Sequence, residues 1–106
     1  MKIKIIKIAI AGIGTVGTGL LSLLKKFKKN HYKIKITHVA ARGNFKKIKK
    51  SFPNSKVYKD AADLLYEHDY DILVELIGGE DGISKKLIFN ALKNKKHVVT
   101  ANKALV

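Results

Sequence analysis

The sequence has no cysteine and only one proline, Pro53. Without cysteine, neither a disulfide framework nor a thiolate metal site can form, and this composition fits a reducing compartment. No apolar run approaches the roughly 20 residues that a helix needs to span a bilayer. The lysine-rich start also lacks the small-residue cleavage site of a signal peptide. These absences predict a soluble, cytoplasmic protein that does not enter a membrane.

Acidic residues are absent from the first 59 positions, and the net charge of the chain is +14. Such a charge suggests nucleic-acid binding, because a basic face that displaces phosphate counterions is typical of those proteins. However, 21 of the 22 basic residues are lysine. Arginine is favoured both for reading bases and for binding phosphate through two hydrogen bonds. A solvated lysine-rich surface is therefore favoured, and a basic nucleic-acid-binding module is the alternative. The stretch FKKIKK, residues 45–50, could still strengthen binding of a polyanionic ligand nearby.

With 106 residues, 46% of them hydrophobic, the chain is long enough for one modest core, so a single domain over residues 1–106 is expected. Apolar patterns typical of strands and of helices alternate along it. Strands are expected at residues 3–11, 34–41, 57–58, 71–77 and 97–100, and helices over 20–29, after Asp60 and over 84–94. This order predicts the α/β class, with a Rossmann-like doubly wound parallel sheet of strand order 3-2-1-4-5, truncated before a sixth strand.

A glycine-rich segment, GIGTVGTG, connects the first strand to the first helix. Its glycines form the pattern G-x-G-x-x-G in the strand-to-helix context where that pattern is informative. The first glycine permits a tight turn, the second lets a pyrophosphate approach the backbone, and the third lets the helix lie close to the strand. Amides of the first helical turn would then face the phosphates. A purely structural turn is the alternative. The predicted cofactor-binding residues in this segment are Gly12, Ile13, Gly14, Thr15, Val16 and Gly17.

The second expected strand ends in Ala40, Ala41 and Arg42, without the carboxylate that usually accepts a hydrogen bond from the ribose 2′-hydroxyl of NAD. Arg42 stands where a 2′-phosphate would lie, and a guanidinium can bind phosphate through two parallel hydrogen bonds. This position predicts NADP as the preferred cofactor and NAD as the second choice, with Lys46 and Lys47 as helpers. An exposed, solvated arginine is the alternative, which is weakened because Arg42 is the only arginine in the chain.

Four motifs, in this order, resemble the amino-terminal nucleotide-binding domain of homoserine dehydrogenase. They are GIGTVGTG after the first strand, HVAAR at the second, VELIGG at the fourth and HVVTANKAL at the fifth. The resemblance extends over essentially the whole chain, and the last two motifs are more specific than the glycine pattern. It implies an NAD(P)-dependent oxidoreductase that interconverts L-homoserine and L-aspartate 4-semialdehyde, a step toward threonine and methionine.

Further site residues are expected at the carboxyl ends of the later strands, which face the ligand crevice of a doubly wound sheet. Thr100, Asn102 and Lys103 should lie beside the cofactor, and the resemblance implies that Lys103 lies at the nicotinamide side near the substrate. Alternatively, Asn102 caps a helix that Lys103 begins. Gly78 would let the backbone approach the nicotinamide ribose, or it is a turn glycine. Glu75 has either a structural role or a ligand role, since a buried carboxylate needs partners.

The resemblance also implies what lies outside this chain. Family members continue with another strand and with a dimerising substrate domain, which holds the substrate-binding acids and a proton-shuttling lysine. We therefore predict no catalytic residue within residues 1–106, and no metal site, because the histidines lack metal-ligand spacing. This fragment is expected to bind NADP(H) without turnover, and the full-length protein is expected to be a homodimer. A free-standing dinucleotide-binding module is the alternative function.

Overall fold

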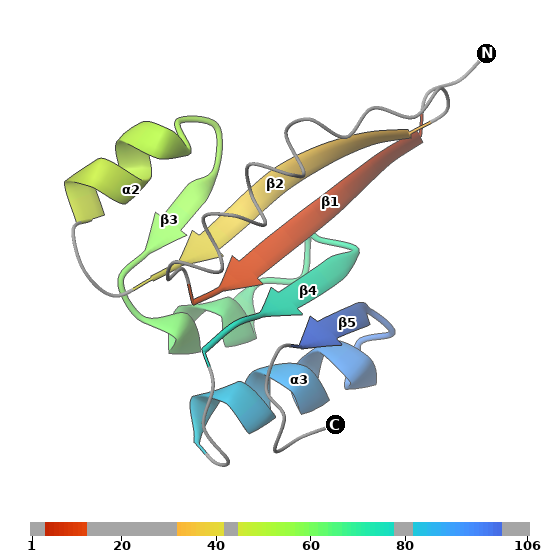
Figure 1. Cartoon of the computed structure of the whole chain (residues 1–106). Coiled ribbons are helices and arrows are strands. Elements are labelled where there is room, and N and C mark those ends of the chain that lie inside the picture. The colour runs from red at the N-terminus through yellow and green to blue at the C-terminus, as the bar shows by residue number, and fades with distance from the viewer. Residues whose placement is uncertain (1–3, 13–31, 42–44, 78–81, 101–106) are drawn as a thin grey trace.

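The computed structural model describes residues 4–12, 32–41, 45–77 and 82–100 of the chain (Figure 1). From β2 onward, strands and helices alternate, which is the order of an α/β protein. The strands are β1 (Lys4–Ala11), β2 (Tyr32–Ala40), β3 (Lys56–Tyr58), β4 (Ile72–Glu75) and β5 (His97–Thr100). The helices are α2 (Phe45–Ser51), the 3₁₀-helix η1 (Ala61–Tyr66) and α3 (Ile83–Lys93).

The five strands form one sheet in the order β3-β2-β1-β4-β5, and every neighbouring pair is parallel. The predicted fold class and strand order are therefore confirmed. β1 lies in the centre, with β2 and β3 on one side and β4 and β5 on the other. The strand order reverses beside β1, and in sheets of this kind ligands bind outside the carboxyl ends of the strands at such a reversal.

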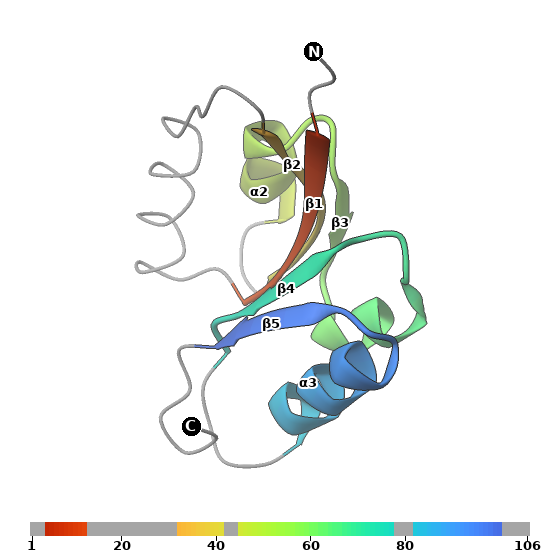
Figure 2. The same ribbon diagram turned by 90° about the vertical axis from the view of Figure 1, so that its right-hand side faces the viewer.

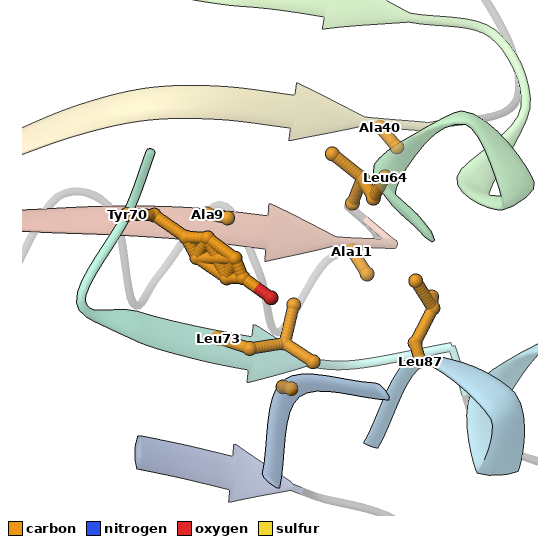
Figure 3. Packing of buried hydrophobic residues seen from close by; sticks show 8 residues of the cluster. Ala9, Ala11, Ala40, Leu64, Tyr70, Leu73 and Leu87 are labelled. Carbon is orange, nitrogen blue, oxygen red and sulfur yellow. The ribbon is translucent and has the colours of Figure 1, made fainter. Parts of the chain in front are cut away.

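The two faces of the sheet carry side chains of different size. Ile8 and Ile10 of β1 are buried on the face toward α2, whereas Ala9 and Ala11 are buried on the opposite face. This alternation follows from the two-residue period of a strand. The alanines leave room for η1 and α3 to pack closely, and Leu87 of α3 fills part of that space (Figure 3). Figure 2 shows α2 on one side of the sheet and η1 with α3 on the other.

Two helices differ from the expectation drawn from the sequence. No helix is expected at residues 45–51, yet they form α2, because Ile48 packs against the core while the lysines, which favour helices, face solvent. The helix expected after Asp60 forms as a 3₁₀-helix of six residues, and Asp60 caps it by accepting a hydrogen bond from the Ala62 amide at 2.9 Å. The helix expected over residues 20–29 lies outside the described residues.

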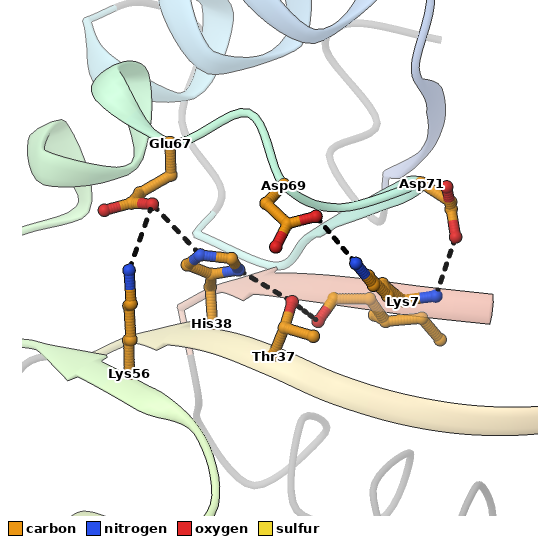
Figure 4. A network of polar contacts seen from close by, with 8 residues as sticks. Lys7, Thr37, His38, Lys56, Glu67, Asp69 and Asp71 are labelled. Carbon is orange, nitrogen blue, oxygen red and sulfur yellow. Dashed lines mark hydrogen bonds and ion pairs between the residues drawn. The ribbon is translucent and has the colours of Figure 1, made fainter. Parts of the chain in front are cut away.

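A polar network joins the end of η1 to β2 and β3 (Figure 4). His38 of β2 is only 2% exposed, and its two ring nitrogens lie 2.7 Å from the Thr37 hydroxyl and 3.1 Å from the Glu67 carboxylate. The Tyr58 hydroxyl donates a hydrogen bond of 2.5 Å to the other oxygen of Glu67. Because Glu67 directly follows η1, these contacts hold the helix against two strands. His38 therefore has a packing role in the fold.

The contact between Glu67 and Tyr58 shifts two pKa values in opposite directions. The Tyr58 hydrogen bond lowers the pKa of Glu67, and the ammonium group of Lys56 adds to this effect. Burial raises the pKa of Tyr58 to about 12, with the Glu67 hydrogen bond as the second cause. A lowered carboxyl pKa stabilises the fold above the ordinary glutamate pKa, and a raised phenol pKa stabilises it below the ordinary tyrosine pKa. The pair should therefore contribute most at neutral pH.

We expect Tyr58→Phe to lower the free energy of unfolding most near neutral pH. The difference from wild type should shrink below about pH 4, as Glu67 is protonated in the native state, and above about pH 10, where the phenol ionises first in the unfolded chain. Urea unfolding followed by circular dichroism across this pH range measures the difference. Tyr66→Phe is the matched control, because Tyr66 is 80% exposed. A Tyr58→Phe difference that is constant with pH would contradict the assigned shifts.

Candidate cofactor-binding site

The carboxyl ends of four strands lie level with one another at one edge of the sheet. Ala11 of β1 is in register with Ala40 of β2 and with Glu75 of β4, and Glu75 is in register with Thr100 of β5. Each strand therefore ends at the same height, and the segments that follow them leave the sheet side by side. This edge is where a doubly wound sheet binds its ligand.

Gly12 leaves β1 at this edge in a conformation that only glycine adopts readily. Its φ is +86°, and its amide donates a hydrogen bond of 2.7 Å to the carbonyl of Ala40. A Cβ at this position would lie 2.9 Å from Cγ1 of Ile77 and 3.0 Å from the Cα and N of the same residue. The first distance is shorter than real Cβ contacts, and the other two, which are to backbone atoms, are tighter than nine in ten of them. The first glycine of the motif thus lies in a tight turn that has no room for a side chain.

Glu75 ties the ends of β4 and β5 together beneath this turn. Its side chain is fully buried, and one carboxylate oxygen accepts a hydrogen bond of 2.7 Å from the Ile77 amide. The other oxygen accepts a hydrogen bond of 2.6 Å from the Thr100 hydroxyl. Both donors belong to the points where the chain leaves a strand. A carboxylate in an apolar strand is tolerated when its oxygens are paired in this way.

The ends of β2 and β3 form a second part of the edge, which carries positive charge. The Ala41 amide donates a hydrogen bond of 3.0 Å to the carbonyl of Tyr58, so the two strands end together. Immediately after β3, the ammonium group of Lys59 lies 5.1 Å from the centre of the Phe45 ring. Lys49 approaches the same ring at 5.9 Å. Two cations thus flank the residue that begins α2, three positions after Arg42.

Comparison with known proteins decides the family. Residues 12–106 match the family model described as "Homoserine dehydrogenase, NAD binding domain". The chain belongs to this family. Two curated homoserine dehydrogenases, from Bacillus subtilis and Methylobacillus glycogenes, are 32% and 37% identical to it over 108 residues, and each alignment covers 97% of this chain. A crystal structure of the Staphylococcus aureus homoserine dehydrogenase at pH 7.5 superposes with a TM-score of 0.82 at 33% identity over 98% of this chain.

These relatives are much longer than the chain. It spans 25% of the B. subtilis enzyme, 26% of the M. glycogenes enzyme and 27% of the S. aureus protein chain. The similarity therefore concerns the NAD-binding domain of homoserine dehydrogenases, and the cofactor class of the family is a nicotinamide dinucleotide. Within the part of the chain that the structure describes, no helix is long and apolar enough to cross a membrane. Among the same residues, no group of three histidine, aspartate or glutamate side chains could hold a metal ion.

The structure describes two of the predicted site residues of this homoserine dehydrogenase domain. Both lie at the edge formed by the carboxyl ends of the strands, here called the ligand edge. Gly12 directly follows β1, and Thr100 ends β5 with its hydroxyl bound to Glu75. The predicted helpers Lys46 and Lys47 are exposed on α2. The other predicted residues lie outside the described ranges: Ile13, Gly14, Thr15, Val16, Gly17, Arg42, Gly78, Asn102 and Lys103.

Lys59 is a candidate that the sequence analysis missed. It is one of 21 lysines, and no motif distinguishes it from the others. Only the pairing of β2 with β3 places it beside the end of β2, where Arg42 follows. The hydrogen bond between Glu75 and Thr100 could not be predicted from the sequence either, because it depends on the register between β4 and β5.

Gly12→Ala should destabilise the domain more than an alanine at another glycine with positive φ. Gly82 is the matched control, since its φ is +71° but no atom of the described residues lies within 4 Å of the point where its Cβ would stand. We expect Gly82→Ala to lose about 1–3 kcal/mol of unfolding free energy from backbone strain. Gly12→Ala should lose about 1 kcal/mol more, because it also overpacks against Ile77. Chemical unfolding of both variants measures the difference, and equal losses would refute the steric role of Ile77.

Proposed function

We propose that this chain is the cofactor-binding part of an NADP-preferring homoserine dehydrogenase, an oxidoreductase that interconverts L-homoserine and L-aspartate 4-semialdehyde. The observation that carries this proposal is the Gly12 turn. It opens the matched region at the carboxyl end of the central strand, and the space for a Cβ is taken by the backbone of Ile77. A pyrophosphate needs backbone amides that it can approach closely, which a glycine-rich strand end provides.

The preference for NADP is supported by the charge at the ends of β2 and β3. The end of β2 offers Ala40 and Ala41 in place of an acid, so the ribose of NAD would lack its usual carboxylate acceptor. Lys59 and Lys49 lie around Phe45 in the same region, and Arg42 is the second residue after the end of β2 in the sequence. The nearby carboxylate of Asp60 already caps η1 through the Ala62 amide. A 2′-phosphate would therefore meet several cations at this edge.

The task of this domain is to hold the cofactor rather than to transform the substrate. When bound, the nicotinamide supplies the carbon that accepts or donates the hydride. The chain's own residues would bind the phosphates near Gly12 and position the nicotinamide half near the ends of β4 and β5. Thr100, Asn102 and Lys103 follow one another at the last of these ends, and Gly78 follows β4. Lys103 would contact cofactor or substrate oxygens as a fixed cation.

The remaining parts of the reaction are proposed for a longer protein. The relatives carry about three quarters of their length beyond the matched region. We place the substrate-binding acids, the proton-transferring lysine and a homodimer interface there, and we propose a cytoplasmic location for the whole enzyme. The family resemblance alone supports these four assignments.

Arg42→Ala should weaken NADPH binding by about 10- to 150-fold, because one charge-assisted contact is worth about 1.5–3 kcal/mol. Lys59→Ala should weaken it by about 2- to 5-fold, as expected for an exposed ion pair. NADH lacks the 2′-phosphate, so its affinity should hardly change in either variant. Isothermal titration calorimetry with both cofactors measures these effects.

Lys33→Ala provides the control for this series, since Lys33 is exposed near the other end of β2. It should leave both cofactors unaffected apart from a small change that salt screens. Equal weakening of NADPH and NADH in Arg42→Ala would assign that residue to the fold or to the adenine pocket, and the NADP preference would then be wrong. Tight, saturable binding of duplex DNA in place of NADPH would favour the nucleic-acid alternative instead.

Residues 1–106 on their own should bind NADPH but should not oxidise homoserine. The domain contains the cofactor edge of the sheet, whereas the groups that bind the substrate and move its hydroxyl proton are assigned to the longer protein. Absorbance of the reduced nicotinamide, followed with homoserine and NADP in excess, measures turnover. Activity that rises in proportion to the concentration of the purified chain and persists on further purification would overturn this assignment.

A further inference from the structure

We propose that Glu75 is a positioning residue that fixes the ends of β4 and β5 for the nicotinamide half of the cofactor. The proposal rests on the proposed function, because it assumes that a dinucleotide binds at this edge. It assigns a role to a carboxylate that lies beneath the site and acts through Ile77 and Thr100 rather than through the ligand.

The first support is the placement of the two hydrogen bonds. One oxygen of Glu75 binds the Ile77 amide at 2.7 Å, and the other binds the Thr100 hydroxyl at 2.6 Å. Ile77 lies two residues after the end of β4, and Thr100 is the last residue of β5. A single side chain therefore sets the direction in which the backbone leaves both strands. The residues that follow are the ones predicted to reach the cofactor, Gly78 after β4 and Asn102 and Lys103 after β5.

The second support is the burial of the side chain. Glu75 is 0% exposed and continues a strand in which Leu73 and Val74 are also buried. A third apolar residue would fill the strand without the desolvation penalty of a carboxylate. A carboxylate can accept from the amide and from the hydroxyl at the same time, one with each oxygen, whereas an apolar side chain can accept from neither. The glutamate therefore serves to accept hydrogen bonds from two donors and so to connect them, rather than to fill the core.

The third support is the link to the glycine turn. The amide of Ile77, which Glu75 holds, belongs to the residue whose backbone lies against Gly12. Leu76 is in turn bound to β1, since its amide donates a hydrogen bond of 2.8 Å to the carbonyl of Ala11. Glu75 thus couples the exits of β1, β4 and β5. In a doubly wound sheet the half built from β4 and β5 serves the second mononucleotide, which is the nicotinamide half.

The test uses substitutions that separate geometry from charge. Thr100→Val keeps the shape of the side chain and removes the hydroxyl. Glu75→Gln keeps both contacts, because its amide oxygen can accept from Ile77 while its amide nitrogen donates to the Thr100 oxygen. Glu75→Leu removes both contacts. Ser51→Ala, which removes an exposed hydroxyl at the end of α2, is the control.

Each variant is titrated with NADPH and with adenosine 2′,5′-bisphosphate, which carries only the adenosine half of the cofactor. Thr100→Val and Glu75→Leu should weaken NADPH by about 10-fold or more and reduce the change in nicotinamide fluorescence on binding. Their affinity for the bisphosphate should stay within about 2-fold of wild type. Glu75→Gln should retain NADPH affinity within about 3-fold. Circular dichroism checks that each variant is folded. If Glu75→Leu is not, Glu75→Asp takes its place, because the shorter side chain draws the carboxylate away from both donors, whereas Thr100 is itself a predicted cofactor-binding residue.

Three results would overturn the positioning role while leaving the proposed function intact. Equal weakening of NADPH and the bisphosphate would mean that Glu75 and Thr100 only support the fold. Unchanged NADPH binding in Thr100→Val would mean that the hydrogen bond between Glu75 and Thr100 has no effect on the nicotinamide half. A loss in Glu75→Gln as large as in Glu75→Leu would assign the effect to charge. If the wild-type chain binds neither ligand, the proposed function itself is wrong and the positioning role falls with it.

Discussion

The close approach of Gly12 to Ile77 is the constraint on which the ligand edge depends. The chain leaves β1 between two occupied neighbours, with Ala40 accepting its amide hydrogen bond on one side and the Ile77 backbone 3.0 Å from a would-be Cβ on the other. No side chain fits there, so the backbone itself forms the surface at the reversal of strand order. The same lack of space that demands a glycine would let a ligand approach the backbone at this strand end.

Two glutamate side chains hold the elements around this edge. Glu75 joins the exits of β4 and β5, and Glu67 joins η1 to β2 and β3 through His38 and Tyr58. Both carboxylates make hydrogen bonds at both oxygens, which offsets the cost of removing them wholly or partly from water. The apolar core packs strands and helices together without directional preference. The carboxylates fix the relative orientation of the elements, because each one makes directional hydrogen bonds to two partners.

Most strands could be predicted because residues 3–11 form a nearly continuous β-branched run and residues 34–41 alternate. The strand order followed from the alternation of strands with helices along the chain. α2 could not, since only Ile48 of its central residues packs on the core and, apart from Phe45, the rest of the segment is polar. Gly12 was predictable from its motif. The roles of Lys59 and of the pair Glu75 and Thr100 were not, because they depend on which strands are neighbours and on their register.

The sheet order also explains why the uneven charge along the chain matters. Residues 1–59 contain 16 basic residues and no acid, and they form β1, β2, α2 and β3, whereas all eight acids follow residue 59. In the sheet, β2 and β3 lie on one side of β1 and β4 and β5 on the other. Some acids that follow residue 59 nevertheless contact the basic segments, since Glu67 accepts a hydrogen bond from Tyr58 and Asp69 pairs with Lys7. If a dinucleotide binds as proposed, its 2′-phosphate would meet the lysines around Phe45 rather than these paired acids. The uneven charge along the sequence would thus favour the phosphates of the proposed ligand, through a field that extends about 8 Å at physiological salt.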